Sequence, residues 1–391
     1  MNWKICRTLF ILIFFCALSD SLVVPLLPPY ANTLGATSFH IGLIFGAAPF
    51  AICVLVSYIG RVSDVRGRKP FVISGFAGFC IISAAFAFFA NVHALILIRF
   101  FQGISFAMVL PVLEAYSGDI TPKGKEGLVM GLFSLTFMIG VCAGPVLGGA
   151  LKDTFGIQAS FFTMGLVCAL GVLTGFLFLP PVKEEPASGK NLSSVSFKRL
   201  LADRRMAGVF LFRLAYFISL GIVWTFAPLL ADTEYNLSGL DTGFIITLGV
   251  IASAVFTVPM GILADKMSKR ILVVIGGLVT ACGMFFFASV REAWQLYAVS
   301  VLIGIGDGIS IPAVTSMTMI MGRKHEAMGS VISLMILGDT LGLVTGPVLA
   351  GLFIDRMGMP VTFGGSGVFM LLAAGAAMIL TSGFQSFETE L

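Results

Sequence analysis

The sequence predicts an all-α membrane protein in which twelve transmembrane helices form two six-helix bundles. The chain has 391 residues, of which 58% are hydrophobic and only 11% are charged, and its mean hydropathy is +1.02. Soluble proteins carry about 25% charged residues, so this composition indicates a bilayer environment. Twelve apolar runs are long enough to span a bilayer, and the two halves of the chain resemble each other.

The spans are continuous apolar runs of about twenty residues, unlike the alternating strands of a membrane barrel. The first could also be a cleavable signal peptide, because Lys4 and Arg7 precede its apolar centre. Its apolar character continues past Asp20 through VVPLLPPY, so we interpret it as a transmembrane helix. We expect spans near 8–31, 39–60, 70–90, 93–116, 127–151, 158–181, 206–230, 241–264, 271–290, 294–320, 327–354 and 360–382.

The distribution of basic residues predicts the orientation of these helices. If both termini are cytoplasmic, nineteen of the 24 Lys and Arg residues lie in inner loops and tails, and only Lys152, Arg291 and Arg356 lie outside. Such an excess is typical of cytoplasmic loops. The basic residues are divided among short loops, so the sequence does not favour a nucleic-acid surface. We therefore expect a multi-pass protein of the inner or plasma membrane with both termini in the cytoplasm.

The longest polar stretch divides the chain into two bundles. Residues 1–182 are the predicted N-terminal bundle, 183–205 a cytoplasmic linker, and 206–391 the C-terminal bundle. GPVLGGALKDTFG at 144–156 shares seven of thirteen positions with GPVLAGLFIDRMG at 346–358, a shift of 202 residues. GRVSDVRGRK at 60–69 recurs in weaker form as GILADKMSKR at 261–270. This duplication predicts a parallel repeat with a substrate path between the bundles.

The loop between the second and third spans combines cations with one carboxylate, Asp64. One interpretation is that these charges do no more than keep the loop in the cytoplasm. The other is that they pair with a neighbouring carboxylate such as Asp119 and hold helix ends together in one conformational state. Gly60 is expected to allow a close approach of two helices. We favour the clasp, because Asp64 and Gly67 have no role in topology. The predicted cytoplasmic gate comprises Gly60, Asp64, Gly67, Arg68, Lys69, Glu114, Asp119, Gly261 and Asp265.

The fifth span carries small residues four positions apart, in GVCAGPVLGG. Such spacing places them on one helix face, where a neighbouring backbone can approach closely. The predicted packing motif comprises Gly140, Gly144, Pro145, Gly148 and Gly149, with Gly346 and Pro347 in the second half.

Charges at membrane depth are expensive and therefore indicate function. Asp20, Asp307 and Asp339 each lie about twelve residues into a predicted span, and Arg99 lies in the fourth. We predict that these four residues couple transport to protons or substrate, although a protonated carboxyl could also be a structural hydrogen-bond donor. Arg213 could extend its side chain to the inner surface without a role in coupling.

These motifs together resemble the major facilitator superfamily, and in particular its twelve-helix drug:proton antiporter branch. The loop Gly60-x-x-x-Asp64-x-x-Gly67-Arg68-Lys69, the stretch RFFQG at 99–103, GVCAGPVLGG at 140–149 and VVPLLPPY at 23–30 are similar to that family's motifs in order and position. The resemblance implies the major facilitator fold and a role for the glycine motif in antiport. Asp20, Asp307 and Asp339 depart from the family pattern, so the resemblance assigns them no role.

We therefore predict a proton-coupled secondary transporter that exports a small amphipathic or cationic compound by alternating access. The alternatives are a metabolite, sugar or siderophore exporter or importer on the same scaffold and, more remotely, a membrane sensor or enzyme. We expect no enzymatic activity, no cofactor beyond a proton gradient and no metal site. The expected partners are a small-molecule substrate and the lipid bilayer, with no nucleic acid, and we expect a monomer.

Overall fold

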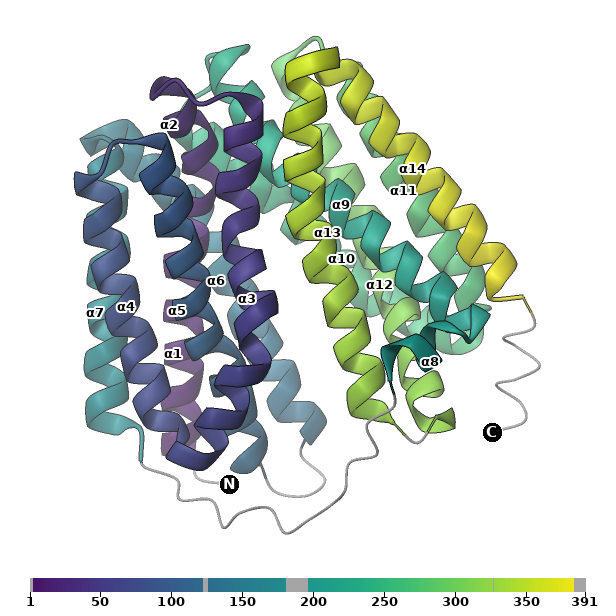
Figure 1. The fold of residues 1–391 in the computed structure, drawn as a ribbon, viewed down its shortest axis with the longest axis horizontal. Helices are drawn as coiled ribbons and strands as arrows, with labels where there is room; N and C mark the ends of the chain where they lie inside the picture. The colour runs from purple at the N-terminus through teal and green to yellow at the C-terminus, as the bar shows by residue number, and fades with distance from the viewer. Residues whose placement is uncertain (1–2, 122–125, 181–195, 326, 383–391) are drawn as a thin grey trace. The chain divides into compact units, whose positions relative to one another are not determined.

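The computed structural model describes residues 3–121, 126–180, 196–325 and 327–382, and Figure 1 shows these residues folded into helices. Twelve of the described helical segments are long and apolar enough to cross a membrane, and the described residues contain no strand. The predicted all-α membrane fold with twelve spans is therefore confirmed.

The first six spans comprise eight helical elements, because the first span is interrupted. Pro25 has no backbone N–H to donate, and a short 3₁₀ segment at this point separates α1 from α2. The elements are α1 (Trp3–Val23), η1 (Val24–Leu26), α2 (Leu27–Thr33), α3 (Ser38–Arg66), α4 (Arg68–Phe88), α5 (Val92–Asp119), α6 (Glu126–Phe155) and α7 (Ile157–Phe178).

The second half contains a short helix and six spans. The elements are α8 (Phe197–Leu201), α9 (Arg204–Thr233), α10 (Gly239–Lys266), α11 (Lys269–Ala288), α12 (Ala293–Lys324), α13 (Met328–Met357) and α14 (Met359–Leu380). Several helices are longer than the apolar runs that predicted them. The reason is that polar residues continue the helical hydrogen bonding beyond the apolar segment; α1, for example, begins at Trp3 and includes Lys4 and Arg7.

Glycines end three of the helices where the next one begins almost at once. Gly67, Gly156 and Gly358 have φ angles of +88°, +85° and +82°, a backbone conformation that disfavours side chains with a Cβ. Each lies directly between two helices, at the junctions α3–α4, α6–α7 and α13–α14. Gly67 therefore has a backbone function in the turn in addition to any role in the predicted gate.

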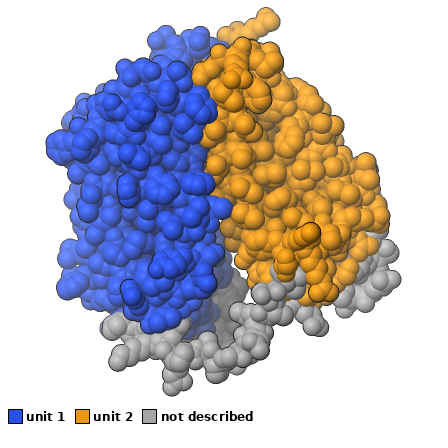
Figure 2. Space-filling model, in the orientation of Figure 1, with its two compact units in different colours: residues 1–188, 228–247 blue, residues 189–227, 248–391 orange. Residues whose placement is uncertain are grey.

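The described chain divides into two compact units, coloured separately in Figure 2. Unit 1 contains residues 1–188 and 228–247, and unit 2 contains residues 189–227 and 248–391. The division near residue 188 falls within the expected linker at 183–205. Residues 228–247, at the end of α9 and the start of α10, group with unit 1.

Within each unit the same pairs of equivalent helices pack together, as a duplication requires. In unit 1, α4 lies against α5 and α7; in unit 2, α11 lies against α12 and α14. These are the third span against the fourth and sixth, and the ninth against the tenth and twelfth. Unit 2 has a buried core around Phe212, Met317, Leu334 and Met370. The core holds α9, α12, α13 and α14 in place around the polar side chains described next.

Candidate functional site

Unit 1 contains a buried polar network that joins α1 to α5. Gln102 donates from Nε2 to Asp20 Oδ1 at 2.8 Å, and Arg99 donates from Nη1 to Gln102 Oε1 at 2.9 Å. The Arg99 and Asp20 charges are 4.0 Å apart, and Arg99 Nε also donates to the Ile44 carbonyl of α3 at 3.2 Å. Only 4% of the Arg99 side chain is exposed, so Asp20 has a fixed cation nearby. Gln102, which connects the two charges, was not among the predicted site residues.

Unit 2 contains a second network, which begins with an ion pair between α9 and α13. Arg213 donates from Nε to Asp339 Oδ1 at 2.6 Å, and its Nη2 bonds to Asp339 Oδ2. The guanidinium also lies 5.9 Å from the centre of the Phe217 ring. A two-point contact of this kind matches the planar fork of arginine to a carboxylate. The expectation that Arg213 simply extends to the inner surface is therefore wrong, because its charge is held by Asp339.

Asp307 lies beside this ion pair but is held by hydroxyl groups. Ser253 of α10 donates its Oγ hydrogen to Asp307 Oδ2, and the Tyr216 hydroxyl of α9 also bonds to the Asp307 side chain. Among the described residues, no cation forms an ion pair with Asp307. The network consequently holds one guanidinium and two carboxyl groups. It is neutral when one carboxyl is protonated and carries one negative charge when both are ionised.

All three carboxyl groups lie far from the helix ends. Asp20 is 17 residues after Trp3 and 13 before Thr33, and Asp307 is 14 residues after Ala293. Asp339 is 11 residues after Met328, the shortest of these separations. At 1.5 Å per residue, each carboxyl lies at least roughly 16 Å from either end of its membrane span, although Asp20 is close to the point where η1 interrupts the first span. Asp20 lies deeper into its span than expected, because α1 starts at Trp3 and not near residue 8.

The predicted gate residues around the α3–α4 turn form a cluster centred on Arg68. Its Nη1 lies 3.0 Å from Asp64 Oδ1, and it holds Asp119 at the end of α5 through Nε and through Nη2, the latter at 3.3 Å. Arg68 is only 8% exposed, so this cation is largely removed from water. The structure brings Arg68, Asp64 and Asp119 together within unit 1. Lys69 lies beside them and donates to the Phe176 carbonyl of α7 at 2.8 Å.

Other predicted gate residues do not join this cluster. A Cβ at Gly60 would meet nothing within 4 Å, so the close helix approach expected there is not formed. Glu114 is exposed, and among the described residues it makes no ion pair with Arg68. In the second half, a Cβ at Gly261 would lie 3.8 Å from Pro312, and the side chain of Asp265 lies outside the described part of the chain. Lys269, which follows Arg68 by 201 residues, is similarly buried.

The glycine motif of α6 packs against α1. A Cβ at Gly140 would lie 2.6 Å from the Ala17 Cβ, and one at Gly144 would lie 2.7 Å from the Leu22 backbone nitrogen. A Cβ at Gly148 would lie closer still to the Leu22 carbonyl oxygen. In unit 2, a Cβ at Gly346 of α13 would lie 2.6 Å from the Ile218 carbonyl oxygen of α9.

A second face of α6 contacts residues 228–247 within unit 1. Gly149 lies against the Gly239 backbone, and the Pro145 carbonyl lies against Gly243. Asp153 accepts from the backbone N–H groups of Gly239 at 2.7 Å and Leu240 at 2.8 Å, which begin α10. Lys152 Nζ lies 3.0 Å from Asp232 Oδ1. A carboxylate is favourable at a helix N-terminus, so these contacts fasten α10 to α6.

These fastening residues were not predicted from the sequence. The sequence identifies Lys152 only as one of three outer cations. No sequence pattern indicates the role of Asp153, because its partners are backbone groups 86 and 87 residues away. In the described part of the chain, no three His, Cys, Asp or Glu residues lie close enough to hold a metal ion. His40 and His93 do meet, with ring centres 5.8 Å apart.

Comparisons with known proteins agree with this architecture. The sequence matches the Major Facilitator Superfamily over residues 9–225 and 209–384. It is 28% identical over 366 residues to an uncharacterized MFS-type transporter of Methanocaldococcus jannaschii, covering 92% of this chain and 93% of that protein. It is 27% identical over 405 residues to the multidrug resistance protein MdtG of Dickeya zeae, covering 99% and 95%.

A solved structure shows the same fold at lower identity. A bacterial homolog of the human lysosomal transporter Spinster has a TM-score of 0.80 and 15% identity, with coverage of 97% of each chain. The family match extends over nearly the whole chain and includes the twelve membrane-spanning helices described above. The chain belongs to the Major Facilitator Superfamily and resembles its drug:proton antiporter branch, and it is a multi-pass membrane transporter, not an enzyme.

Proposed function

We propose that this transporter exports small amphipathic or cationic compounds in exchange for protons, and that Asp307 carries the exchanged proton. Protons from the gradient and the substrate would compete for one negative charge in unit 2, and no further cofactor is required. Cytoplasmic termini, as the basic residues predict, would place the Arg68 cluster on the inner side of the membrane. We further propose that the transporter acts as a monomer.

The observation that carries this proposal is the unequal partnering of the three buried carboxyl groups. Asp20 lies 4.0 Å from Arg99, and Asp339 is held at two points by Arg213. Protonation of either would leave a buried guanidinium with a weakened partner, at a considerable cost in free energy. Asp307 has two hydroxyl partners instead.

Hydroxyl partners suit a group that changes its protonation state. Ser and Tyr can each donate a hydrogen bond to a carboxylate, and each can accept one from a carboxylic acid after rotation of its O–H group. Asp307 can therefore gain or lose a proton while its partners remain in place. The loss of that proton creates a negative charge at membrane depth, which attracts a cationic substrate.

The relatives support export of drug-like compounds. MdtG of Dickeya zeae is named a multidrug resistance protein, and this chain covers 95% of its length. A metabolite, sugar or siderophore transporter on the same scaffold is the remaining alternative. It predicts the same proton coupling but a different substrate profile.

Transport by purified protein in proteoliposomes tests the proposal. Ethidium serves as the probe. An imposed pH gradient should drive the accumulation of ethidium in the compartment with the higher proton concentration. Asp307→Asn should abolish this accumulation, and Glu234→Gln, at an exposed carboxylate, should leave it unchanged. Accumulation that ignores the pH gradient would contradict proton coupling. Coupled transport of a metabolite but not of any lipophilic cation would favour the alternative.

A further inference from the structure

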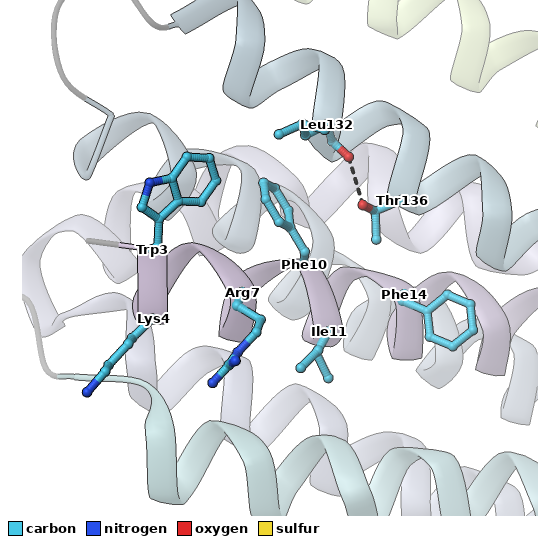
Figure 3. A pocket seen from close by; sticks show the side chains of 8 residues that line it. All are labelled: Trp3, Lys4, Arg7, Phe10, Ile11, Phe14, Leu132 and Thr136. Carbon is cyan, nitrogen blue, oxygen red and sulfur yellow. Dashed lines mark hydrogen bonds between the residues drawn. The ribbon is translucent and has the colours of Figure 1, made fainter. Parts of the chain in front are cut away.

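Two places in unit 1 gather polar side chains away from the networks described above. The first is a groove of about 620 Å³ between the start of α1 and α6. Figure 3 shows Lys4 and Arg7 extending from the side of α1 opposite Trp3, Phe10 and Leu132, so the polar groups of this groove do not converge on one point. Convergence of a few polar groups is what a binding site requires. The second place, at the beginning of α3 and α5, meets that requirement.

His40 of α3 and His93 of α5 bring two imidazole rings together. The ring centres are 5.8 Å apart, and the ring planes make an angle of 72°. Two imidazoles bound to one Zn²⁺ ion at about 2.1 Å, with a tetrahedral angle between them, have ring centres roughly 5 Å apart. A small rotation of the side chains therefore suffices for both rings to reach one metal ion. His93 is exposed and His40 is partly buried, so an ion from solution has access to them.

The backbone at both histidines is fixed by a helix cap. Thr37 Oγ1 accepts from the His40 N–H at 3.4 Å where α3 begins, and Asn91 Oδ1 accepts from the His93 N–H at 2.9 Å where α5 begins. The helices α3 and α5 also pack directly against each other. Ligands on packed helices are held more precisely than ligands on loops, so this pair is already positioned for a shared ion.

Thr37 also orients the His40 ring. Its Oγ1 lies 3.0 Å from His40 Nδ1. When Nδ1 carries the hydrogen and donates it to this hydroxyl, Nε2 keeps the lone pair that binds a metal. Metal-binding histidines usually hold their second ring nitrogen in this way. The His93 ring makes no hydrogen bond within the described part of the chain, so its nitrogens are available as the second ligand.

We propose that His40 Nε2 and the His93 ring bind one divalent transition-metal ion, such as Zn²⁺, between the beginnings of α3 and α5. Imidazole nitrogen suits Zn²⁺, Cu²⁺ and Ni²⁺, whereas Mg²⁺ and Ca²⁺ prefer oxygen ligands. No third His, Cys, Asp or Glu among the described residues joins the pair, so water completes the coordination. The sequence alone does not indicate this site, because the two histidines are far apart along the chain.

A Zn²⁺ titration of the full-length protein, with any purification tag removed, tests the proposal. The variant Cys282→Ser is the starting protein, because Cys282 is an exposed thiol that could bind Zn²⁺ itself. Isothermal titration calorimetry should show saturable binding of one Zn²⁺ per chain. Zn²⁺ should also raise the thermal unfolding midpoint saturably, since an ion that binds only the folded state stabilises it. Mg²⁺ at the same concentration should do neither. Absence of saturable Zn²⁺ binding, or an equal effect of Mg²⁺, would overturn the proposal.

Histidine variants locate the site, with the third histidine of the chain as a matched control. Even a partner behind a metal ligand is worth about 10–100-fold in affinity, so His40→Gln and His93→Gln should each weaken Zn²⁺ binding at least about tenfold. His325→Gln, at the end of α12 beside Asp203, should bind Zn²⁺ as the starting protein does. An unchanged affinity in either His40→Gln or His93→Gln, or a loss of binding in His325→Gln, would contradict the assignment.

Discussion

Arg213 on α9 is bonded at two points to Asp339 on α13, 126 residues later in the chain. This pair neutralises one of the two carboxyl groups in unit 2 and leaves Asp307 as the group whose charge is not balanced by a bonded cation. In the proposed mechanism the pair is a fixed structural element, and the neighbouring Asp307 carboxyl is the group that changes its charge.

Loss of either member of this pair should destabilise the protein. Arg213→Gln leaves the Asp339 carboxylate without its cation in a largely buried position, where removal of one partner typically costs about 3–5 kcal/mol. The double variant Arg213→Gln with Asp339→Asn removes both charges, and we expect it to be more stable than Arg213→Gln alone. The stabilities of the two variants are compared by thermal unfolding in detergent, with size-exclusion chromatography used to monitor the loss of folded protein. If the double variant is the less stable of the two, the ion pair does not have the role described.

The Arg68 cluster predicts unequal effects for its two carboxylates. Asp64 is about half exposed, whereas Asp119 is more buried and bonds to Arg68 through two nitrogens. Asp119→Asn should therefore slow transport more than Asp64→Asn, although both variants should insert normally into the membrane. Arg68→Lys should also slow transport, because a lysine cannot form the same fork between two carboxylates. Initial transport rates, normalised to the amount of membrane-inserted protein, measure this. Normal transport by Asp119→Asn would reduce the cluster to a determinant of topology.

The glycine seam predicts that an added methyl group is harmful at some positions of α6 and tolerated at others. Gly144→Ala would place a carbon 2.7 Å from the Leu22 nitrogen, and we expect a loss of about 1–3 kcal/mol in stability. Gly131→Ala is the matched control, because a Cβ there meets nothing within 4 Å. The unfolding midpoints of the two variants should differ clearly. Equal midpoints would show that α1 and α6 do not pack closely in solution.

Asp203, at the start of α9, predicts a dependence of stability on pH. Burial raises the pKa of this carboxyl, but the backbone N–H of Arg205 and the charges of Lys324 and His325 outweigh burial and lower it. Because its pKa is depressed in the folded state, Asp203 stabilises the protein at neutral pH, and the contribution disappears as pH falls through that lowered pKa. Asp203→Asn should cost about 1 kcal/mol at pH 7, as expected for a helix cap.

The pH range over which this effect disappears follows from the ordinary pKa of aspartate, about 3.9. The difference in unfolding midpoint between wild type and Asp203→Asn should be present from pH 7 to about pH 5, should begin to fall near pH 4, and should vanish only below the lowered pKa of the folded state. Glu234→Gln serves as the exposed control. A difference that grows on acidification would contradict the assignment of the lowered pKa to Asp203.

The sequence predicted those features that depend on composition and on local spacing. Twelve spans follow from apolar length, and the link between Arg68 and Asp119 was expected because both lie near the same end of neighbouring helices. Gly140 and Gly144 face α1 because residues four apart share a helix face.

The remaining features depend on how each helix is rotated and on where its partner lies. Arg213 and Asp339 are 126 residues apart, and no local pattern shows that their side chains point at each other. The same is true of Gln102, whose amide reaches Asp20 across 82 residues. Asp153 bonds to backbone groups, which leave no mark in the sequence at all. These contacts could not be predicted without the packed helices.

Proton release on substrate binding tests the central claim, the assignment of the exchanged proton to Asp307, most directly. Addition of ethidium to wild-type protein in weakly buffered detergent solution should release protons, which a pH indicator records. Asp307→Asn should abolish the release while the protein remains folded, and Glu234→Gln should release protons as wild type does. Undiminished release by Asp307→Asn would contradict the assignment.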